Sequence, residues 1–315
     1  MSARRALVTG VTGQDGGYLA ELLLDRGYEV FGLTRSGAPD HVTPVTGELL
    51  DAGSLRAAVR ETRPDELYHL AAPTFVPASW EDPTEVVEAI AVATGVLLGA
   101  AREAGSRVYV AASSEVFGDA GESPQHERSP MRPRSPYGVA KLAAHGLVGA
   151  LRERFGLFAV SGITYNHESP RRPLRFLPRK VTRGAAAIAL GLEEELVLGD
   201  LGAVRDWHHA ADTARGAHLA LQADAPRDYV FASGVGRTVG DLVDAAFAAA
   251  GVSPDGRIRV DPAFVRPPEA TPLVGDPSRA ERELGWRAEI PFEAMIAEMV
   301  EADLAELRDA GPSGA

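Results

Sequence analysis

Two hydroxyl groups, a carboxylate and an amine occur in this chain at spacings that suit acid–base chemistry. Ser113 and Glu115 stand in one short string, and Tyr137 and Lys141 follow in the run Ser-Pro-Tyr-Gly-Val-Ala-Lys. Positions i and i+4 share one face of a helix, so Lys141 can lie beside Tyr137 and lower the pKa of its phenol, which is ordinarily ~10. The pair taken alone is equally compatible with two ordinary surface residues, so the rest of the chain must decide.

A glycine-rich string near the start of the chain predicts a dinucleotide site. The string Gly10-Val-Thr-Gly-Gln-Asp-Gly16 follows an apolar run at 5–9 and opens a helix expected at 17–26. Glycines at such a junction permit a tight turn and let a pyrophosphate approach the positive end of the helix. The residues predicted to contact the cofactor are Gly10, Thr12, Gly13, Gln14, Asp15, Gly16, Leu70, Ala71, Tyr137 and Lys141.

The residues after the second expected strand favour NADP over NAD. NAD sites usually place an acid there to bind the ribose 2′-hydroxyl group, but this chain reads Leu33-Thr-Arg-Ser36. Arg35 can pair with a 2′-phosphate instead, which predicts a further cofactor contact. The alternative is a solvated loop arginine.

Strand-like and helix-like patterns alternate through the first half of the chain. This alternation predicts an α/β fold of the Rossmann type, with a doubly wound parallel sheet covered on both faces and a smaller C-terminal substrate-binding lobe. The expected strands are 5–9, 30–33, 67–70, 108–112 and 157–162, and the expected helices are 17–26, 54–61, 84–104, 136–154 and 176–191.

The pattern changes after about residue 165. Residues 166–173 read as a loop, and short strands and helices with many Gly and Pro follow the helix at 176–191. We therefore expect an NADP-binding domain over 1–165 and a substrate-binding lobe over 166–315, partly threaded back onto the sheet.

Composition excludes several classes of function. The formal net charge of −12 disfavours nucleic-acid and anionic-membrane partners. The absence of cysteine excludes disulfides and thiolate metal sites and suits the reducing cytoplasm, where we expect the protein. Neither a signal peptide nor a membrane span is predicted, because the N-terminus lacks a long apolar stretch. No metal is expected, since the adjacent His208 and His209 lack a suitable ligand spacing.

Four strings in the chain resemble the extended short-chain dehydrogenase/reductase superfamily and, within it, the GDP-mannose 4,6-dehydratase family. Asn166-His-Glu-Ser-Pro-Arg-Arg172 is the most specific of them. The similarity runs from about residue 4 to residue 306, and Gly199–Trp207 and Arg266–Glu269 resemble nucleotide-sugar segments. The other strings are Gly10–Gly16, Ser113–Gly118 and Pro133–Lys141.

The resemblance implies a reaction and its residues. It implies that Ser113, Glu115, Tyr137 and Lys141 carry catalysis with NADP on a nucleotide-diphosphate sugar, most simply GDP-mannose. The basic segment 171–183 can cradle a diphosphate and a purine, although some of its cations suit a solvated helix face. The residues expected to bind substrate are Ser114, Asn166, Arg171, Arg179, Lys180, Arg205, Arg266 and Glu269.

Two segments depart from the family pattern. Pro73, Phe75 and Pro77 stand where the family has polar groups near the sugar, which leaves the sugar open. The stretch between Arg35 and Gly47 is shorter than the family's arginine-rich loop that joins dimers into tetramers. We therefore expect a homodimer rather than a tetramer.

Competing functions share the same cofactor and tyrosine. A nucleotide-sugar 4-epimerase or 4-ketoreductase does not need the base that Glu115 offers, whereas a decarboxylase can carry a similar string. A dinucleotide sensor without activity would not need Tyr137 and Lys141.

Overall fold

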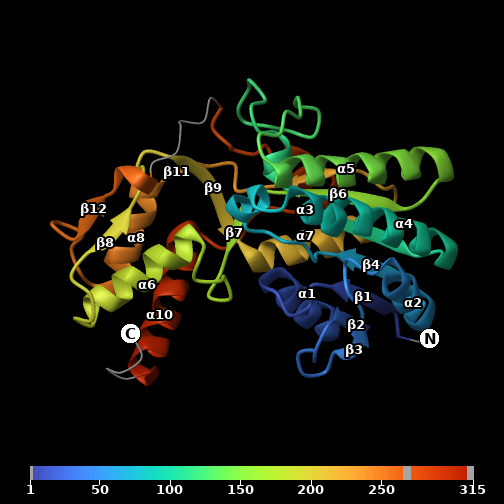
Figure 1. The fold of residues 1–315 in the computed structure, drawn as a ribbon, viewed down its shortest axis with the longest axis horizontal. Coiled ribbons are helices and arrows are strands. Elements are labelled where there is room, and N and C mark those ends of the chain that lie inside the picture. The colour runs from blue at the N-terminus through green and yellow to red at the C-terminus, as the bar shows by residue number, and fades with distance from the viewer. Residues whose placement is uncertain (1–2, 265–270, 311–315) are drawn as a thin grey trace.

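A parallel sheet forms the centre of the larger part of the molecule (Figure 1). The computed structural model describes residues 3–264 and 271–310. The strand order is β10-β6-β5-β4-β1-β2-β3, and every neighbouring pair is parallel. The strands are rich in buried apolar residues, as a sheet covered on both faces requires. They are β1 (Arg5–Thr9), β2 (Glu29–Thr34), β3 (Thr43–Thr46), β4 (Glu66–His69), β5 (Arg107–Ala111), β6 (Ala159–Thr164) and β10 (Tyr229–Phe231).

Helices cover the two faces of this sheet. On one face α1 (Gln14–Asp25) packs against α7 (Ala210–Gln222), and their Leu19, Leu23 and Ala217 enter a core with the fully buried Trp286. The other face holds a second core that includes Leu55, Leu97 and Val148. These residues come from α2 (Ala52–Thr62), α4 (Ala93–Ala104) and α5 (Pro136–Phe155).

The long helix expected at 84–104 is interrupted. It consists of α3 (Pro83–Val87), a π-helical turn η2 (Glu88–Val92) and α4. The stretch 83–104 is long and apolar enough to cross a membrane by length and composition, but more than half of it is buried inside the fold. Because α4 lies on the sheet and contacts α2 and α5, we interpret the stretch as a core helix.

A smaller lobe lies beside the sheet, on the left of Figure 1. Three helices surround its own core, to which Leu196, Phe247 and Met295 contribute. The order of its larger sheet is β11-β9-β7, and β12 pairs with β8. The elements are β7 (Asn166–Glu168), α6 (Leu177–Ala189), β8 (Leu196–Leu198), β9 (Val204–His209), β11 (Gly236–Thr238), α8 (Val239–Ala250), β12 (Ile258–Val260), η4 (Pro262–Phe264) and α10 (Phe292–Ala310).

The predicted fold class is confirmed, and three short strands correct the details. Residues 166–168, expected in a loop, form β7 and pair with β9. β3 and β10 were not predicted, because each is only three or four residues long at an edge of the large sheet. β10, α7 and the short helix α9 (Ser278–Leu284) return from the second half of the chain to the large sheet.

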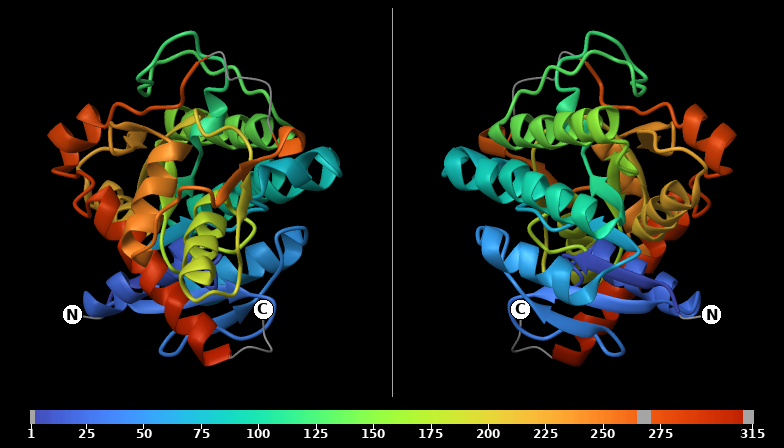
Figure 2. Two further views of the ribbon diagram at one scale, coloured as in Figure 1. Left: turned by 90° about the vertical axis from the view of Figure 1, so that its left-hand side faces the viewer. Right: turned by 90° about the vertical axis from the view of Figure 1, so that its right-hand side faces the viewer.

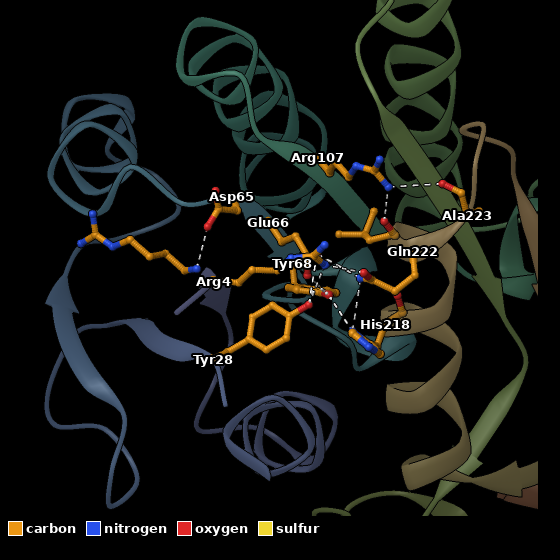
Figure 3. Close-up of polar contacts among 11 residues, drawn as sticks. Arg4, Tyr28, Asp65, Glu66, Tyr68, Arg107, His218, Gln222 and Ala223 are labelled. Carbon is orange, nitrogen blue, oxygen red and sulfur yellow. Dashed lines mark hydrogen bonds and ion pairs between the residues drawn. The ribbon is translucent and has the colours of Figure 1, made fainter. Parts of the chain in front are cut away.

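A cluster of polar side chains closes the amino edge of the large sheet (Figure 3). Glu66, the first residue of β4, is 2% exposed and accepts hydrogen bonds from the Tyr68 hydroxyl at 2.7 Å and Gln222 Nε2 at 3.0 Å. Tyr28 and Arg4 also donate to it, at 3.2 and 3.3 Å. These four donors and Glu66 form the Glu66 cluster, which ties β1, β2, β4 and α7 together.

Candidate active site

The glycine-rich turn lies at the carboxyl edge of the sheet, between β1 and α1. Gly10 has a φ of +74°, and a side chain there would meet the backbone of Ala71 at 2.9 Å. A side chain on Gly16 would meet the Gly10 carbonyl oxygen at 2.1 Å. The turn therefore needs glycine at both positions, and it leaves the backbone N–H groups at the start of α1 in the position that suits a pyrophosphate.

Thr9 and His69, which the sequence did not single out, join the ends of β1 and β4. The Thr9 hydroxyl oxygen accepts from the backbone N–H groups of Leu70 and Ala71, both at 3.1 Å, and lies 2.8 Å from His69 Nδ1. Burial, followed by the Lys141 charge, lowers the pKa of His69 to about 3. Neutral His69 can then accept a hydrogen bond from the Thr9 hydroxyl group. Together these hydrogen bonds fix the segment that carries the predicted cofactor residues Leu70 and Ala71.

The Ser113–Glu115 string forms a short turn against the start of α5. Ser113 caps the 3₁₀ turn η3 (Ser114–Val116) by accepting from Glu115 N at 3.3 Å. At the start of α5, Ser135 caps by accepting from Gly138 N at 3.1 Å. A side chain on Gly138 would meet the Glu115 carbonyl oxygen at 2.7 Å, so glycine there lets the turn reach Tyr137. The connection between η3 and α5 extends from the body as a long loop, at the top of both views in Figure 2.

Tyr137 and Lys141 lie together near the carboxyl edge, but the expected effect of Lys141 on Tyr137 is wrong for this structure. Burial raises the pKa of Tyr137 to about 12, although a hydrogen bond with the Ser113 side chain acts in the opposite direction. Lys141 Nζ lies 5.8 Å from the centre of the Tyr137 ring and donates to the Ala111 carbonyl oxygen at 2.6 Å. Burial lowers the pKa of Lys141 to about 8. Burial is the largest cause of both shifts.

The side chains of Gln14 and Asp15 contact the protein itself. Gln14 donates to the His167 carbonyl oxygen at 3.0 Å and accepts from the Ser169 hydroxyl at 2.8 Å. Asp15 lies 2.8 Å from His167 Nε2. Both side chains thus tie the turn to β7 and the residues that follow it. His167 and Ser169 lie inside the string that carried the resemblance, and their pairing with the turn was not predicted.

Two of the predicted substrate residues lie in η3 and β7, and two others pair with charged side chains on helices. Ser114 is 5% exposed in η3, and Asn166 is half-buried in β7. Arg171 lies over the Tyr18 ring at 4.0 Å and pairs with Glu21 on α1 at 2.8 Å.

Arg179 corrects the sequence-based expectation. It is 3% exposed and pairs with Asp303 at 2.9 Å and Glu306 at 3.0 Å on α10. Its guanidinium joins α6 to α10, so its placement does not suit a role in binding substrate.

The remaining predicted residues are spread over the two lobes. Thr12 is exposed in the turn and Arg35 is exposed directly after β2. Lys180 donates to the Val197 carbonyl oxygen at 2.8 Å, and Arg205 in β9 donates to the Val204 carbonyl oxygen at 2.7 Å. Arg266 and Glu269 lie outside the described residues.

The segment that departs from the family pattern contributes an aromatic contact. Phe75 meets Phe176 edge-on at 5.7 Å, and the Arg175 guanidinium lies 5.2 Å from the Phe75 ring. Phe176 is the N-cap residue of α6, so the contact joins the loop after β4 to the smaller lobe. Pro73 and Pro77 flank it and restrict the backbone of this loop.

No metal centre is seen among residues 3–264 and 271–310, where no group of three or more His, Asp or Glu side chains has a suitable arrangement.

Comparisons with known proteins agree with this arrangement. A family model described as GDP-mannose 4,6 dehydratase matches residues 7–299. A GDP-mannose 4,6-dehydratase of Yersinia enterocolitica is 40% identical over 353 residues, which cover 97% of this chain and 95% of the relative. GDP-mannose 4,6 dehydratase 2 of Arabidopsis thaliana is 41% identical over 323 residues, with coverage of 95% and 86%.

Solved structures share the fold over almost the whole chain. The Pseudomonas aeruginosa protein RMD, solved with NADPH, has a TM-score of 0.84 at 25% identity and covers 97% of this chain and 100% of its own. The Streptomyces venezuelae dTDP-glucose 4,6-dehydratase DesIV has a TM-score of 0.83 at 26% identity, with coverage of 97% and 98%. With two curated relatives at 40% identity or more over nearly their full length and a family model spanning residues 7–299, this chain belongs to the GDP-mannose 4,6-dehydratase family of the extended short-chain dehydrogenase/reductase superfamily.

Proposed function

We propose that this protein is an NADP-dependent lyase of the cytoplasm that converts GDP-mannose to GDP-4-keto-6-deoxymannose. One observation carries the proposal: the turn with Ser113 and Glu115 packs through Gly138 against the helix that bears Tyr137 and Lys141. A hydroxyl group, a carboxylate, a phenol and an amine thus meet near the carboxyl edge of a parallel sheet, where open α/β sheets bind their ligands. The family membership supports the same reaction.

The residues present fit NADP. Gly10 and Gly16 leave a turn that side chains would fill, and the start of α1 offers backbone N–H groups to a diphosphate. Arg35 is exposed at the end of β2, where an NAD site carries an acid. Bound NADP⁺ would supply an acceptor for a hydride from C4 of the sugar, a positive charge in the site, and the same hydride for C6 at the end.

Tyr137 takes the proton of the 4-hydroxyl group as the C4 hydride leaves. Ser113, whose side chain hydrogen-bonds Tyr137, can also donate to the oxygen at C4. Burial raises the pKa of Tyr137 to about 12, so positive charge beside the phenol would favour its ionisation. Lys141, fixed by the Ala111 carbonyl oxygen, keeps an amine close to that position.

Glu115 performs the elimination. The ketone at C4 acidifies the C5 proton, which the Glu115 carboxylate removes. The electron pair of the C5–H bond forms the C5=C6 double bond, and the 6-hydroxyl group leaves as water with the proton from Glu115. The hydride then adds to C6, a solvent proton adds to C5, and the proton held by Tyr137 returns to solvent, so the protein consumes no external reductant.

Substrate binding divides between the lobes. Ser114 lies in η3, between Ser113 and Glu115, and Asn166 lies on β7, and we assign Arg205 on β9 to the nucleotide. Phe75 and Phe176 give the sugar side an apolar, aromatic wall in place of the polar groups of the family.

A product assay tests the proposal. Purified protein incubated with GDP-mannose and no added NADPH should form a 4-keto sugar nucleotide that has lost one water. Glu115→Gln, a nearly isosteric change, should stop the elimination while C4 oxidation continues. A product epimerised at C4 with its 6-hydroxyl group intact, or full activity in Glu115→Gln, would favour an epimerase or reductase instead.

We also propose a homodimer formed by the outer face of the helices around α5. Trp80 in η1 (Val76–Trp80), Val92 in η2 and Val139 in α5 are 64%, 54% and 51% exposed, on elements that pack together. Exposed apolar side chains gathered on neighbouring elements suit a second copy of the chain. Val139→Glu should shift the sedimentation coefficient of the purified protein toward the monomer, whereas an unchanged dimer would place the contact elsewhere.

A further inference from the structure

Three side-chain contacts connect the glycine-rich turn with the string 166–170. Gln14 holds this string through the His167 carbonyl oxygen and the Ser169 hydroxyl group, and Asp15 holds it through the His167 ring. The turn precedes α1 in the large domain, and β7 belongs to the sheet of the smaller lobe. The contacts therefore join the cofactor side of the site to the strand that carries Asn166.

The surroundings of the His167 ring determine its charge. Nδ1 lies 2.7 Å from the Tyr165 carbonyl oxygen, and Nε2 lies 2.8 Å from Asp15 Oδ2. A carbonyl oxygen and an ionised carboxylate only accept hydrogen bonds, so both ring nitrogens must carry a proton. Burial alone would lower the pKa of His167, but the Asp15 charge and hydrogen bond outweigh it and raise that pKa above its ordinary value. His167 is thus an imidazolium.

Other charged and titratable groups face this pair. Arg172, from the segment after β7, acts to lower the pKa of His167. His208 on β9 lies 5.8 Å away, ring to ring, and is neutral because burial holds its pKa well below the ordinary value. Glu168, next to His167 on β7, is buried beside Arg172. Among the residues that the structure describes, Asp15 is the carboxylate that contacts the His167 ring.

The Asp15 carboxylate also acts on the catalytic residues. Its charge acts to raise the pKa of both Tyr137 and Lys141. Burial acts to raise the pKa of Asp15 itself, but the charge and hydrogen bond of His167, together with Gln14 and Arg172, outweigh it, and the pKa is lowered overall. An imidazolium at this place therefore compensates a partly buried carboxylate whose charge acts on Tyr137.

We propose that His167 is a positioning residue: as an imidazolium it neutralises Asp15 and clamps the glycine-rich turn to β7, so that NADP binds to a turn already fixed against the substrate lobe. This rests on the proposed function for the identity of the cofactor. Both partners of the clamp are charged at pH values between the lowered pKa of Asp15 and the raised pKa of His167. The clamp opens at higher pH, when the imidazolium loses its proton.

The protonation state can be measured without turnover. The chain has 8 histidines, and His167→Gln assigns the His167 signals in ¹⁵N-histidine NMR spectra. Wild-type protein at pH 7 should show both His167 nitrogens protonated, and Asp15→Asn should shift the ring to the neutral form. A neutral His167 ring in the wild-type protein at pH 7 would overturn the proposal.

NADP affinity tests the clamp through a double-mutant cycle. Asp15→Asn and His167→Gln should each weaken NADP binding about tenfold. Because both changes break the same contact, the double variant should lose no more NADP affinity than the single variant with the larger loss. Additive losses, or affinities within twofold of the wild type, would contradict the clamp. Lys141 titrates in the same pH range, so the comparison is made at fixed pH.

A matched control distinguishes loss of the Asp15–His167 contact from the general effect of removing an ion pair. Arg152 and Asp228 form a partly buried pair at 2.8 Å, near the end of α5 farthest from Tyr137. Asp228→Asn should lower the melting temperature but leave the NADP affinity unchanged. If the wild-type protein does not bind NADP at all, the proposed cofactor fails, while the NMR result still decides the charge of His167.

Discussion

Two buried glutamates illustrate how differently the two ends of this molecule use their charges. Glu66, at the amino edge of the large sheet, is 2% exposed and receives hydrogen bonds from the Glu66 cluster (Figure 3). Glu168, at the end of β7, is fully buried. Its two carboxylate oxygens accept no hydrogen bond from the part of the chain that the structure describes. Its partner is Arg172, whose Nε lies 3.1 Å away.

The difference in hydrogen bonding between Glu66 and Glu168 suggests different roles for the two edges, one in stability and one in binding and catalysis. A buried carboxylate with several donors stabilises the elements that supply them, whereas one without hydrogen bonds costs free energy. Burial raises the pKa of Glu168, and Arg172 only partly opposes this. Asp15, His167, Glu168 and Arg172 all gather near the carboxyl edge, on the glycine-rich turn and in the string 166–172 that carries the family resemblance. We therefore expect changes at this edge to affect binding and catalysis, and changes in the Glu66 cluster to affect stability.

Tyr137→Phe should produce the largest effect and confine it to catalysis. Removing the phenolic oxygen removes the general base, so kcat should fall by roughly 10²–10⁴-fold. NADP affinity and the urea midpoint should stay close to those of the parent, because the ring still fills its buried site. Activity within a few fold of the parent would exclude Tyr137 as the base.

Glu66→Gln tests the opposite edge. The amide cannot accept all the donors of the Glu66 cluster, so the free energy of unfolding should fall by about 1–3 kcal/mol. Urea denaturation measures this loss, and kcat at a temperature where the variant remains folded serves as the control. A large drop in kcat without lost stability would contradict the division between the two edges.

Arg35→Ala should change the choice of cofactor rather than the reaction. Loss of the cation at the end of β2 should weaken NADP binding by about tenfold, because the charge-assisted contact to the 2′-phosphate is lost. NAD binding should hardly change. Titration with both cofactors measures the ratio, and tighter binding of NAD by the parent protein would argue against the NADP assignment.

Glu168→Gln should have the smallest effect, and its sign is informative. Because the folded-state pKa of Glu168 is raised, its ionisation destabilises the protein as pH rises from the unfolded-state value through the raised value. The glutamine variant should lack this decline, so its unfolding free energy should equal or exceed that of the parent at pH 8. Urea denaturation from pH 4 to 8 measures it. A loss comparable to that in Glu66→Gln would show that Glu168 is as well satisfied as Glu66.

Local patterns predicted much of the fold. The strands β1, β2, β4, β5 and β6 were found from apolar runs, because a doubly covered parallel sheet buries nearly every residue of its strands. β7 was missed because its residues Asn-His-Glu are polar, and its pairing with β9 depends on a segment about 40 residues later. β3 and β10 are too short for periodicity to detect.

The site was predictable where its residues are close in sequence. The i, i+4 spacing placed Lys141 near Tyr137, and the glycine string marked the turn. Arg179 was misassigned because its partners Asp303 and Glu306 lie on the last helix, far along the chain. The direction of the Tyr137 pKa shift was wrong because burial, which spacing cannot reveal, is the largest influence on that phenol. The pairing of Asp15 with His167 likewise depends on the meeting of two lobes.

Deuterium incorporation from solvent at C5 of the product tests the central claim, elimination of water by the Glu115 carboxylate, most directly. Wild-type protein is incubated with GDP-mannose in ²H₂O without added NADPH, and the product is examined by NMR. If Glu115 removes the C5 proton and water is lost across C5 and C6, the product is a 4-keto-6-deoxy sugar with deuterium at C5. A product that keeps its original C5 hydrogen, or that keeps its 6-hydroxyl group, would contradict the dehydratase.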